Sequence, residues 1–215
     1  MTNVKQEIQI PVGNFFIYGD LQHVTHSNGL IVFAHGSGSS RFSERNQFIA
    51  NKLNAAHFST LLFDLLTPEE DRIDVYTREF RFNIPLLADR LILVSHWLYN
   101  NKETTHLKIG YFGSSTGAAA ALIAAAKAPG NIVAIVSRGG RPDLAEGYLA
   151  AIRAPTLLIV GALDYEVITL NEHAYAQLTC EKKLVLIPEA THLFEEEGTL
   201  EQVAQVSADW FKKYM

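Results

Sequence analysis

The sequence predicts an α/β fold, in which helices cover both faces of a mostly parallel, twisted sheet of about eight strands. Short apolar runs alternate with segments of helical periodicity, as βαβ units require. Several of these runs are apolar at nearly every position, which is typical of parallel strands buried on both faces. A chain of 215 residues commonly forms one α/β unit, so residues 1–215 are expected to be a single domain.

The composition is that of an ordinary globular protein, with 48% hydrophobic and 19% charged residues. A net charge of −5 argues against general nucleic-acid binding, and no apolar run reaches the roughly 18 residues of a membrane span. The lone Cys180 suits a reducing compartment, and the polar start, Met1 to Glu7, lacks the apolar core of a signal peptide. We therefore expect a cytoplasmic monomer or homodimer that binds neither membranes nor nucleic acid.

The first half of the chain is expected to open with an antiparallel hairpin. Two strand-like runs, 7–12 and 15–21, flank Gly13-Asn14, a common hairpin turn. Buried strands are expected at 29–34 and 60–66, and helices at 42–56, at 84–99 and in a short segment starting at Thr67.

The second half continues the alternation. A strand from residue 107 leads into an alanine-rich helix that ends near residue 128, before Pro129-Gly130. Further strands are expected at 132–136, 155–160 and 183–188, helices at 144–152, 170–178 and 200–214, and a loop at 138–143.

The segment Gly113-Ser114-Ser115-Thr116-Gly117 fits the G-x-S-x-G nucleophile elbow, in which a sharp strand-to-helix turn exposes a serine hydroxyl. Its position between an apolar strand and a helix of small residues is the context that this motif needs. Ser115 is the predicted nucleophile because only it has glycine two residues before and two residues after. The alternative is a structural serine that caps the helix.

Asp164 and His192 complete a candidate catalytic triad. Each follows a predicted strand, and functional groups of such sheets gather beyond the carboxyl ends of the strands. A serine hydroxyl needs a base to take its proton, and the imidazole needs a carboxylate to fix its tautomer. The alternatives are a turn role for Asp164, with Glu166 as its rival, and a loop-capping role for His192.

The loop at 35–40 is expected to help stabilise the oxyanion of the tetrahedral intermediate through backbone amides. We predict that the amide of Thr116 and that of Ser37 or Gly38 form this oxyanion hole. His35 in the same loop is expected to be structural rather than chemical. No pair of histidines has convincing metal-ligand spacing, and no metal or organic cofactor is implied.

The chain resembles the α/β-hydrolase superfamily and, within it, the small dienelactone hydrolase-like group without a lid. The motifs that carry the resemblance are His35-Gly36-Ser37-Gly38, Gly113-Ser114-Ser115-Thr116-Gly117, Gly161-Ala162-Leu163-Asp164 and Ala190-Thr191-His192. The resemblance implies the three-layer α/β-hydrolase fold without a large cap domain, and acyl transfer as the mechanism. That group typically carries cysteine where this chain has Ser115, so its substrate does not carry over.

Six arginines follow predicted strands, on the side where the site is expected, whereas the lysines lie elsewhere. They are Arg41, Arg72, Arg78, Arg81, Arg138 and Arg141. Because arginine binds carboxylate or phosphate with a planar fork, we hypothesise that Arg138 or Arg141 binds an anionic group of the substrate. The favoured alternative is that these arginines form surface ion pairs with neighbouring acids such as Asp143.

The sequence thus predicts a serine hydrolase that cleaves a small ester or thioester through Ser115, His192 and Asp164. A small-peptide hydrolase, an acyltransferase and a non-catalytic binding module on the same scaffold remain alternatives. Only residues 67–83 are available to cover the site, so the pocket is expected to be open or lightly covered. The aromatic residues Tyr76, Phe80 and Phe82 are candidates for its wall, with packing against the fold as the alternative for at least one of them.

Overall fold

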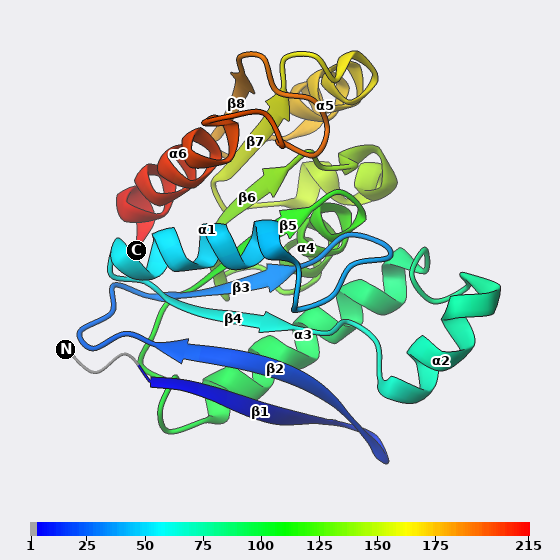
Figure 1. Ribbon diagram of the computed structural model, residues 1–215, viewed down its shortest axis with the longest axis vertical. Coiled ribbons are helices and arrows are strands. Elements are labelled where there is room, and N and C mark those ends of the chain that lie inside the picture. Colours follow the sequence, from blue (N-terminus) through cyan, green and yellow to red (C-terminus); the bar gives the residue numbers. More distant parts are fainter. Residues whose placement is uncertain (1–3) are drawn as a thin grey trace.

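A computed structural model describes residues 4–215 and contains one eight-stranded sheet in the order β1-β2-β4-β3-β5-β6-β7-β8 (Figure 1). The prediction about a signal peptide rests on the polar segment from Met1 to Glu7. Residues 1–3 of that segment lie outside the described residues. The antiparallel pairs are β1 with β2 and β2 with β4, and the other neighbours are parallel. The strands are β1 (Val4–Val12), β2 (Phe15–His23), β3 (Leu30–Ala34), β4 (Ser59–Phe63), β5 (Ile109–Ser114), β6 (Ile132–Arg138), β7 (Thr156–Gly161) and β8 (Lys182–Ile187).

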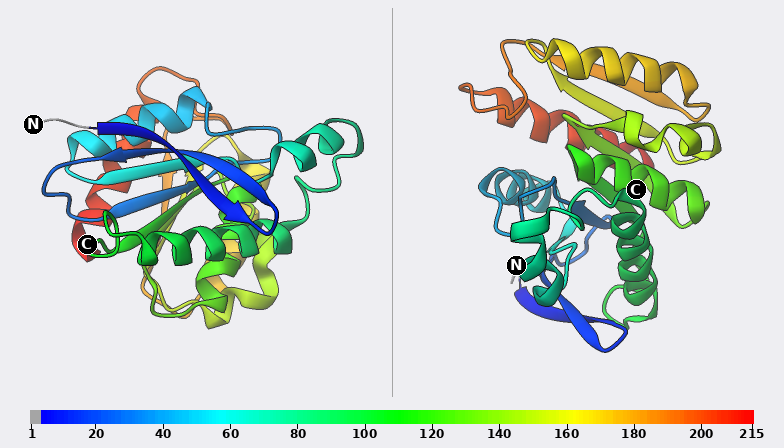
Figure 2. Two further views of the ribbon diagram at one scale, coloured as in Figure 1. Left: turned by 90° about the horizontal axis from the view of Figure 1, so that it is seen from below. Right: turned by 90° about the vertical axis from the view of Figure 1, so that its right-hand side faces the viewer.

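Helices cover both faces of the sheet, which confirms the predicted three-layer arrangement (Figures 1 and 2). One face packs against α1 (Glu44–Ala55) and α6 (Thr199–Tyr214). The other packs against α3 (Ile84–Asn100), α4 (Thr116–Lys127), the 3₁₀ segment η1 (Pro142–Ala151) and α5 (Tyr165–Gln177). None of the helices described is both long and apolar enough to cross a membrane.

The central strands and α4 form the most deeply buried part of the core. Every residue of β3, β5 and β7 is buried, as the continuous apolar runs predict. Residues 116–125 of α4 are also buried, because its alanines allow the helix to lie close to the sheet and to α3. This rigid centre fixes the turn between β5 and α4.

Between β4 and α3 the chain contains only one short helix, α2 (Pro68–Thr77). As predicted, no large cap domain is inserted at this point of the described chain. The helix starts with the predicted capping box, in which Thr67 and Glu70 satisfy each other's backbone amides. Its end is held by Asp74, whose carboxylate accepts hydrogen bonds from the amides of Phe80 (2.7 Å) and Arg81 (3.0 Å). Asp74 also pairs with the Arg81 side chain.

Several predicted boundaries differ from the structure: β1 begins before residue 7, β4 ends at Phe63 rather than at residue 66, and two further differences lie beside the candidate site. Strand β6 runs on through Arg138, which the sequence placed in a loop, because Ser114 of β5 continues the pairing with Arg138. Helix α5 begins at Tyr165 rather than near residue 170. Its first turns contain the β-branched Val167, Ile168 and Thr169, which have low helix propensity, and tertiary packing overrides that preference.

Candidate active site

Ser115 occupies a strained turn between β5 and α4, with φ 50° and ψ −122°. A positive φ is uncommon for a residue with a side chain and is often found at functional sites. The flanking glycines permit the turn: a Cβ on Gly113 would lie 2.4 Å from the Cα of Ala118, and one on Gly117 would lie 2.3 Å from the carbonyl oxygen of Ala34. The predicted elbow therefore has the geometry that its glycines imply.

His192 and Asp164 form the acid–base part of the predicted triad. The Nδ1 atom of His192 lies 2.6 Å from Oδ2 of Asp164. Asp164 precedes α5 but makes no side-chain capping bond to it, so its carboxylate is available to the imidazole. In this arrangement Nδ1 carries the donated proton and Nε2 is free to act as a base. The rival Glu166 makes no hydrogen bond to His192 within residues 4–215.

The segment that follows β6 contacts both Ser115 and His192. The amide of Arg141 donates to the carbonyl of Ser115 at 3.1 Å. A Cβ built on Gly139 would lie 3.5 Å from Cε1 of His192. The structure thus brings the predicted nucleophile and the predicted base against one short segment, but within residues 4–215 no hydrogen bond joins the Ser115 hydroxyl to His192. In unliganded enzymes this bond is often long and shortens only when substrate binds.

The three predicted oxyanion donors differ in their surroundings. The amide of Ser37 donates to the Oγ1 atom of Thr116 at 2.8 Å. Among the residues described, the amides of Thr116 and Gly38 have no hydrogen-bond acceptor. Gly38 has φ 73°, so the loop turns there in a way that favours glycine. The amides of Thr116 and Gly38 therefore keep a free proton, whereas that of Ser37 is already bonded.

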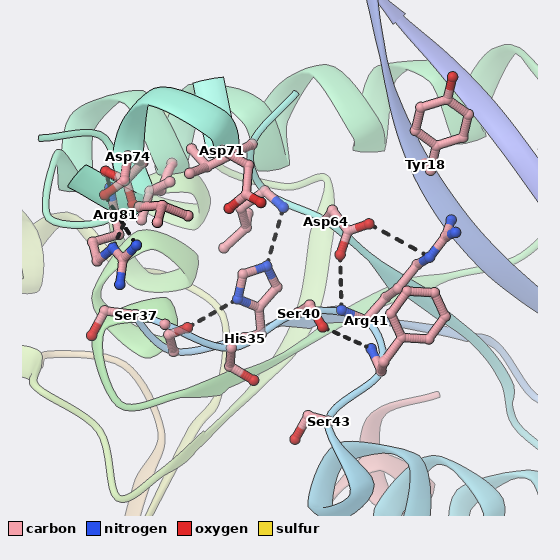
Figure 3. A pocket seen from close by; sticks show the side chains of 18 of the residues that line it. Tyr18, His35, Ser37, Ser40, Arg41, Ser43, Asp64, Asp71, Asp74 and Arg81 are labelled. Atoms are coloured by element: carbon pink, nitrogen blue, oxygen red, sulfur yellow. Dashed lines mark hydrogen bonds and ion pairs between the residues drawn. The ribbon is translucent and has the colours of Figure 1, made fainter. Parts of the chain in front are cut away.

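His35 is structural, in agreement with the sequence. Its Nδ1 lies 3.0 Å from the carbonyl oxygen of Gly36, and the amide of Leu65 donates to its Nε2 at 3.2 Å (Figure 3). Burial lowers the pKa of His35, so the ring stays neutral and ties the β3–α1 loop to the end of β4. Within residues 4–215, no three His, Cys, Asp or Glu side chains are grouped in a way that could hold a metal ion.

A cavity of about 800 Å³ lies between the β3–α1 loop and α2 (Figure 3). Its walls include Gly36, Ser37 and Gly38, and apolar side chains of Leu65, Leu66, Val75 and Leu87. Asp64 pairs with Arg41, and Asp74 with Arg81, along its sides (Figure 3). The three predicted wall residues, Tyr76, Phe80 and Phe82, do not line this cavity, and Tyr76 is 88% exposed; its aromatic lining comes from Tyr18 and Phe42 instead. Gly36 touches both the cavity and Ser115, since its Cβ would lie 3.1 Å from that of Ser115.

The two candidate substrate-binding arginines have opposite environments. Arg141 forms a two-pronged ion pair with Asp143, with distances of 2.9 and 2.8 Å, which matches the surface ion-pair alternative. Arg138 is only 8% exposed, and its Nε and Nη1 have no hydrogen-bond partner among the residues described. Burial, together with the positive charge of Arg45, lowers the pKa of Arg138 to about 10. Its guanidinium lies over the ring of Phe194, 5.9 Å from the ring centroid.

Comparison with solved structures shows an extensive match to a dienelactone hydrolase from Anabaena variabilis. The two chains share 51% sequence identity over 99% of each, with a TM-score of 0.97. The esterase Est1E of Butyrivibrio proteoclasticus is similar in fold, with a TM-score of 0.79, 15% identity and coverage of 96% of this chain and 98% of that one. No model of a protein family matches the chain.

Two curated proteins from two strains of Mycobacterium tuberculosis are 53% identical to this chain over 206 residues. Both are provisionally named phosphoribosyl transferases. The match covers 96% of this chain but only 46% of either relative. The chain therefore spans about half the length of the curated relatives that it matches.

Proposed function

This chain belongs to the dienelactone hydrolase-like α/β-hydrolases, and we propose that it is a serine hydrolase that cleaves a small ester or thioester. The observation that carries the proposal is the pairing of His192 with Asp164 at 2.6 Å, beside a serine in the strained elbow conformation. The esterases and hydrolases among proteins of similar fold support hydrolysis as the reaction class.

The proposed mechanism is acyl transfer through Ser115. His192 Nε2 takes the hydroxyl proton while Oγ attacks the acyl carbon, and the new oxyanion accepts hydrogen bonds from backbone amides, with Thr116 as one donor. Collapse of this intermediate expels the alcohol or thiol, which receives the proton from His192. Water then attacks the acyl-enzyme with the same assistance, which releases the acid and restores Ser115. Asp164 holds His192 in the required tautomer throughout.

We propose that the cavity beside α2 receives one side of the ester. Its wall at Gly36 to Gly38 is the loop that contacts Ser115, so a substrate bound there can extend to the nucleophile. The apolar and charged lining suits a small molecule with a polar substituent. In the sheet order, β3 and β4 lie on one side of β5 while β6 lies on the other. Arg138 therefore borders the opposite side of Ser115 from the cavity.

We further propose that the substrate carries an anionic group that binds Arg138. The carbonyl of Arg138 accepts a hydrogen bond from the Ser115 amide at 3.2 Å, so the two residues are backbone neighbours. A buried cation without a carboxylate partner is costly, and a bound carboxylate or phosphate would offset that cost. Arg141 is the weaker candidate because Asp143 already occupies its fork.

An ester pair tests this assignment. Arg138→Gln and Arg141→Gln are assayed on an aryl butyrate and on the corresponding aryl half-ester of succinate, which adds a carboxylate. Arg138→Gln is expected to lose roughly 10- to 100-fold in kcat/KM on the half-ester, since a charged hydrogen bond is removed, and much less on the butyrate. Arg141→Gln should affect both substrates equally. Equal losses on both esters in the Arg138 variant would rule out an anion-binding role.

The two relatives named phosphoribosyl transferases are about twice as long as the region that they share with this chain. The match of 206 residues includes the region from Ser115 to His192, so we propose that the shared region is the hydrolase part of those longer proteins. A substrate panel separates the possibilities: aryl esters, thioesters, short peptides, an acyl acceptor other than water, and phosphoribosyl diphosphate. Ester or thioester cleavage supports the proposal. Turnover of peptides or release of diphosphate would replace it, and binding without turnover would indicate a non-catalytic module.

A further inference from the structure

The hydroxyl of Thr116 contacts the loop that was expected to supply an oxyanion donor. Thr116 is the first residue of α4, directly after the nucleophile, and is 5% exposed. Its Oγ1 accepts a hydrogen bond from the amide of Ser37 at 2.8 Å, between residues 79 positions apart. The sequence assigned Thr116 a role through its amide alone.

This contact determines what each group can still offer. The single proton of the Ser37 amide is directed at Oγ1, so it is not aimed at an incoming oxyanion. A hydroxyl that accepts a hydrogen bond keeps its own proton for donation. Within residues 4–215, no group accepts a hydrogen bond from the Thr116 hydroxyl. Besides the amide of Gly38 in the loop, the free donors next to Ser115 are therefore the amide and the hydroxyl of Thr116.

The surrounding structure holds this arrangement in place. His35 links the loop to Leu65, and the amide of Ser39 donates to the carbonyl of Gly36 at 3.1 Å. On the helix side, a Cβ on Gly117 would lie 2.4 Å from the carbonyl oxygen of His35, so loop and helix are already in close backbone contact. Freeing the Ser37 amide would require either a buried side chain to rotate or this contact to open.

We propose that the Thr116 hydroxyl is a catalytic oxyanion donor, polarised from behind by the amide of Ser37. The inference rests on the proposed serine hydrolase function. The oxyanion then accepts two hydrogen bonds from Thr116, one from its amide and one from its hydroxyl, whose proton stays on Oγ1. Both donors belong to the residue that directly follows Ser115, so the same buried turn that positions the nucleophile also holds them. The hydrogen bond from Ser37 strengthens the hydroxyl as a donor through cooperativity.

The test compares Thr116→Val, which keeps the shape and removes the hydroxyl, with Thr116→Ser, which keeps the hydroxyl. On an aryl ester that the unmodified protein cleaves, Thr116→Val is expected to lower kcat by roughly 100-fold with KM little changed, the usual cost of one oxyanion donor. Thr116→Ser should retain most of kcat. Affinity for an aryl trifluoromethyl ketone, which forms a charged tetrahedral adduct, should fall in Thr116→Val in parallel with kcat.

Two results would overturn the inference. Unchanged or higher kcat in Thr116→Val would mean that the hydroxyl merely shields the Ser37 amide. An equal loss in Thr116→Ser would mean that the methyl group, and hence packing, is what matters. If Thr116→Val does not fold by circular dichroism, Thr116→Ala replaces it in the same comparison. Absence of ester cleavage by the unmodified protein is a different result, because it contradicts the proposed function itself.

Discussion

The Nδ1 atom of His192 lies 2.6 Å from the Oδ2 atom of Asp164, although the two residues come from loops that follow different strands, β7 and β8. The adjacency of these strands in the parallel sheet brings the loops together. Asp164 is largely buried, whereas His192 is partly exposed. This pairing occupies Nδ1 and leaves Nε2 as the nitrogen to which the proposed mechanism assigns the proton transfer.

Asp164→Asn should impair the base without removing it. An amide can bond the imidazole in the wrong tautomer, so kcat for an aryl ester is expected to fall by roughly 1,000- to 10,000-fold while the protein stays folded. Glu166→Gln is the matched control, since Glu166 lies two residues away and should leave kcat within a few-fold of normal. Steady-state kinetics and circular dichroism make the comparison. A larger loss in the Glu166 variant would transfer the role to that residue.

Gly117→Ala should destabilise the fold, because the new Cβ would lie 2.3 Å from one backbone carbonyl oxygen and 2.4 Å from another. We expect a loss of about 3 kcal/mol, at the upper end of ordinary overpacking. Gly147→Ala is the control: no atom lies within 4 Å of its added Cβ, and its φ is not in the left-handed region. Its stability should stay unchanged or rise by up to about 1 kcal/mol. Urea denaturation measures both, and equal stabilities would contradict the close packing of the elbow.

The neutral state of His35 predicts a loss of stability in mild acid. Burial lowers its pKa in the fold, against the raising effects of the Gly36 carbonyl, Asp64 and Asp71, while the unfolded chain titrates near the ordinary value of 6.5. Below that pH the unfolded state binds more protons, so the free energy of unfolding falls, by at most about 1.4 kcal/mol per pH unit. The contribution is fully present above pH 6.5. Urea denaturation at several pH values between 7 and 5 measures the free energy of unfolding. In His35→Gln this free energy should change less steeply with pH than in the unmodified protein, and an identical pH dependence would refute this explanation.

The sequence predicted the fold and the identity of the triad candidates because their signals are local. Glycine spacing around Ser115 specifies the turn, and alternating periodicity specifies the sheet. The environments of Arg138 and Thr116 were not predictable in this way. The environment of Arg138 depends on how far β6 continues beside β5. That of Thr116 depends on a hydrogen bond with Ser37, which lies 79 positions away in the sequence. The cavity beside α2 likewise arises from three separate segments that only the fold brings together.

Covalent labelling with a fluorophosphonate tests the central claim most directly, because an activated serine hydroxyl displaces fluoride from the reagent and becomes phosphonylated, whereas an ordinary serine does not react. The unmodified protein should be labelled, and peptide mapping should place the adduct on Ser115 rather than on Ser114. Labelling should disappear in Ser115→Ala and fall steeply in His192→Ala, with both variants folded. A folded protein that takes up no label at Ser115, or a Ser115→Ala variant that labels as the unmodified protein does, would contradict the assignment of Ser115 as the nucleophile.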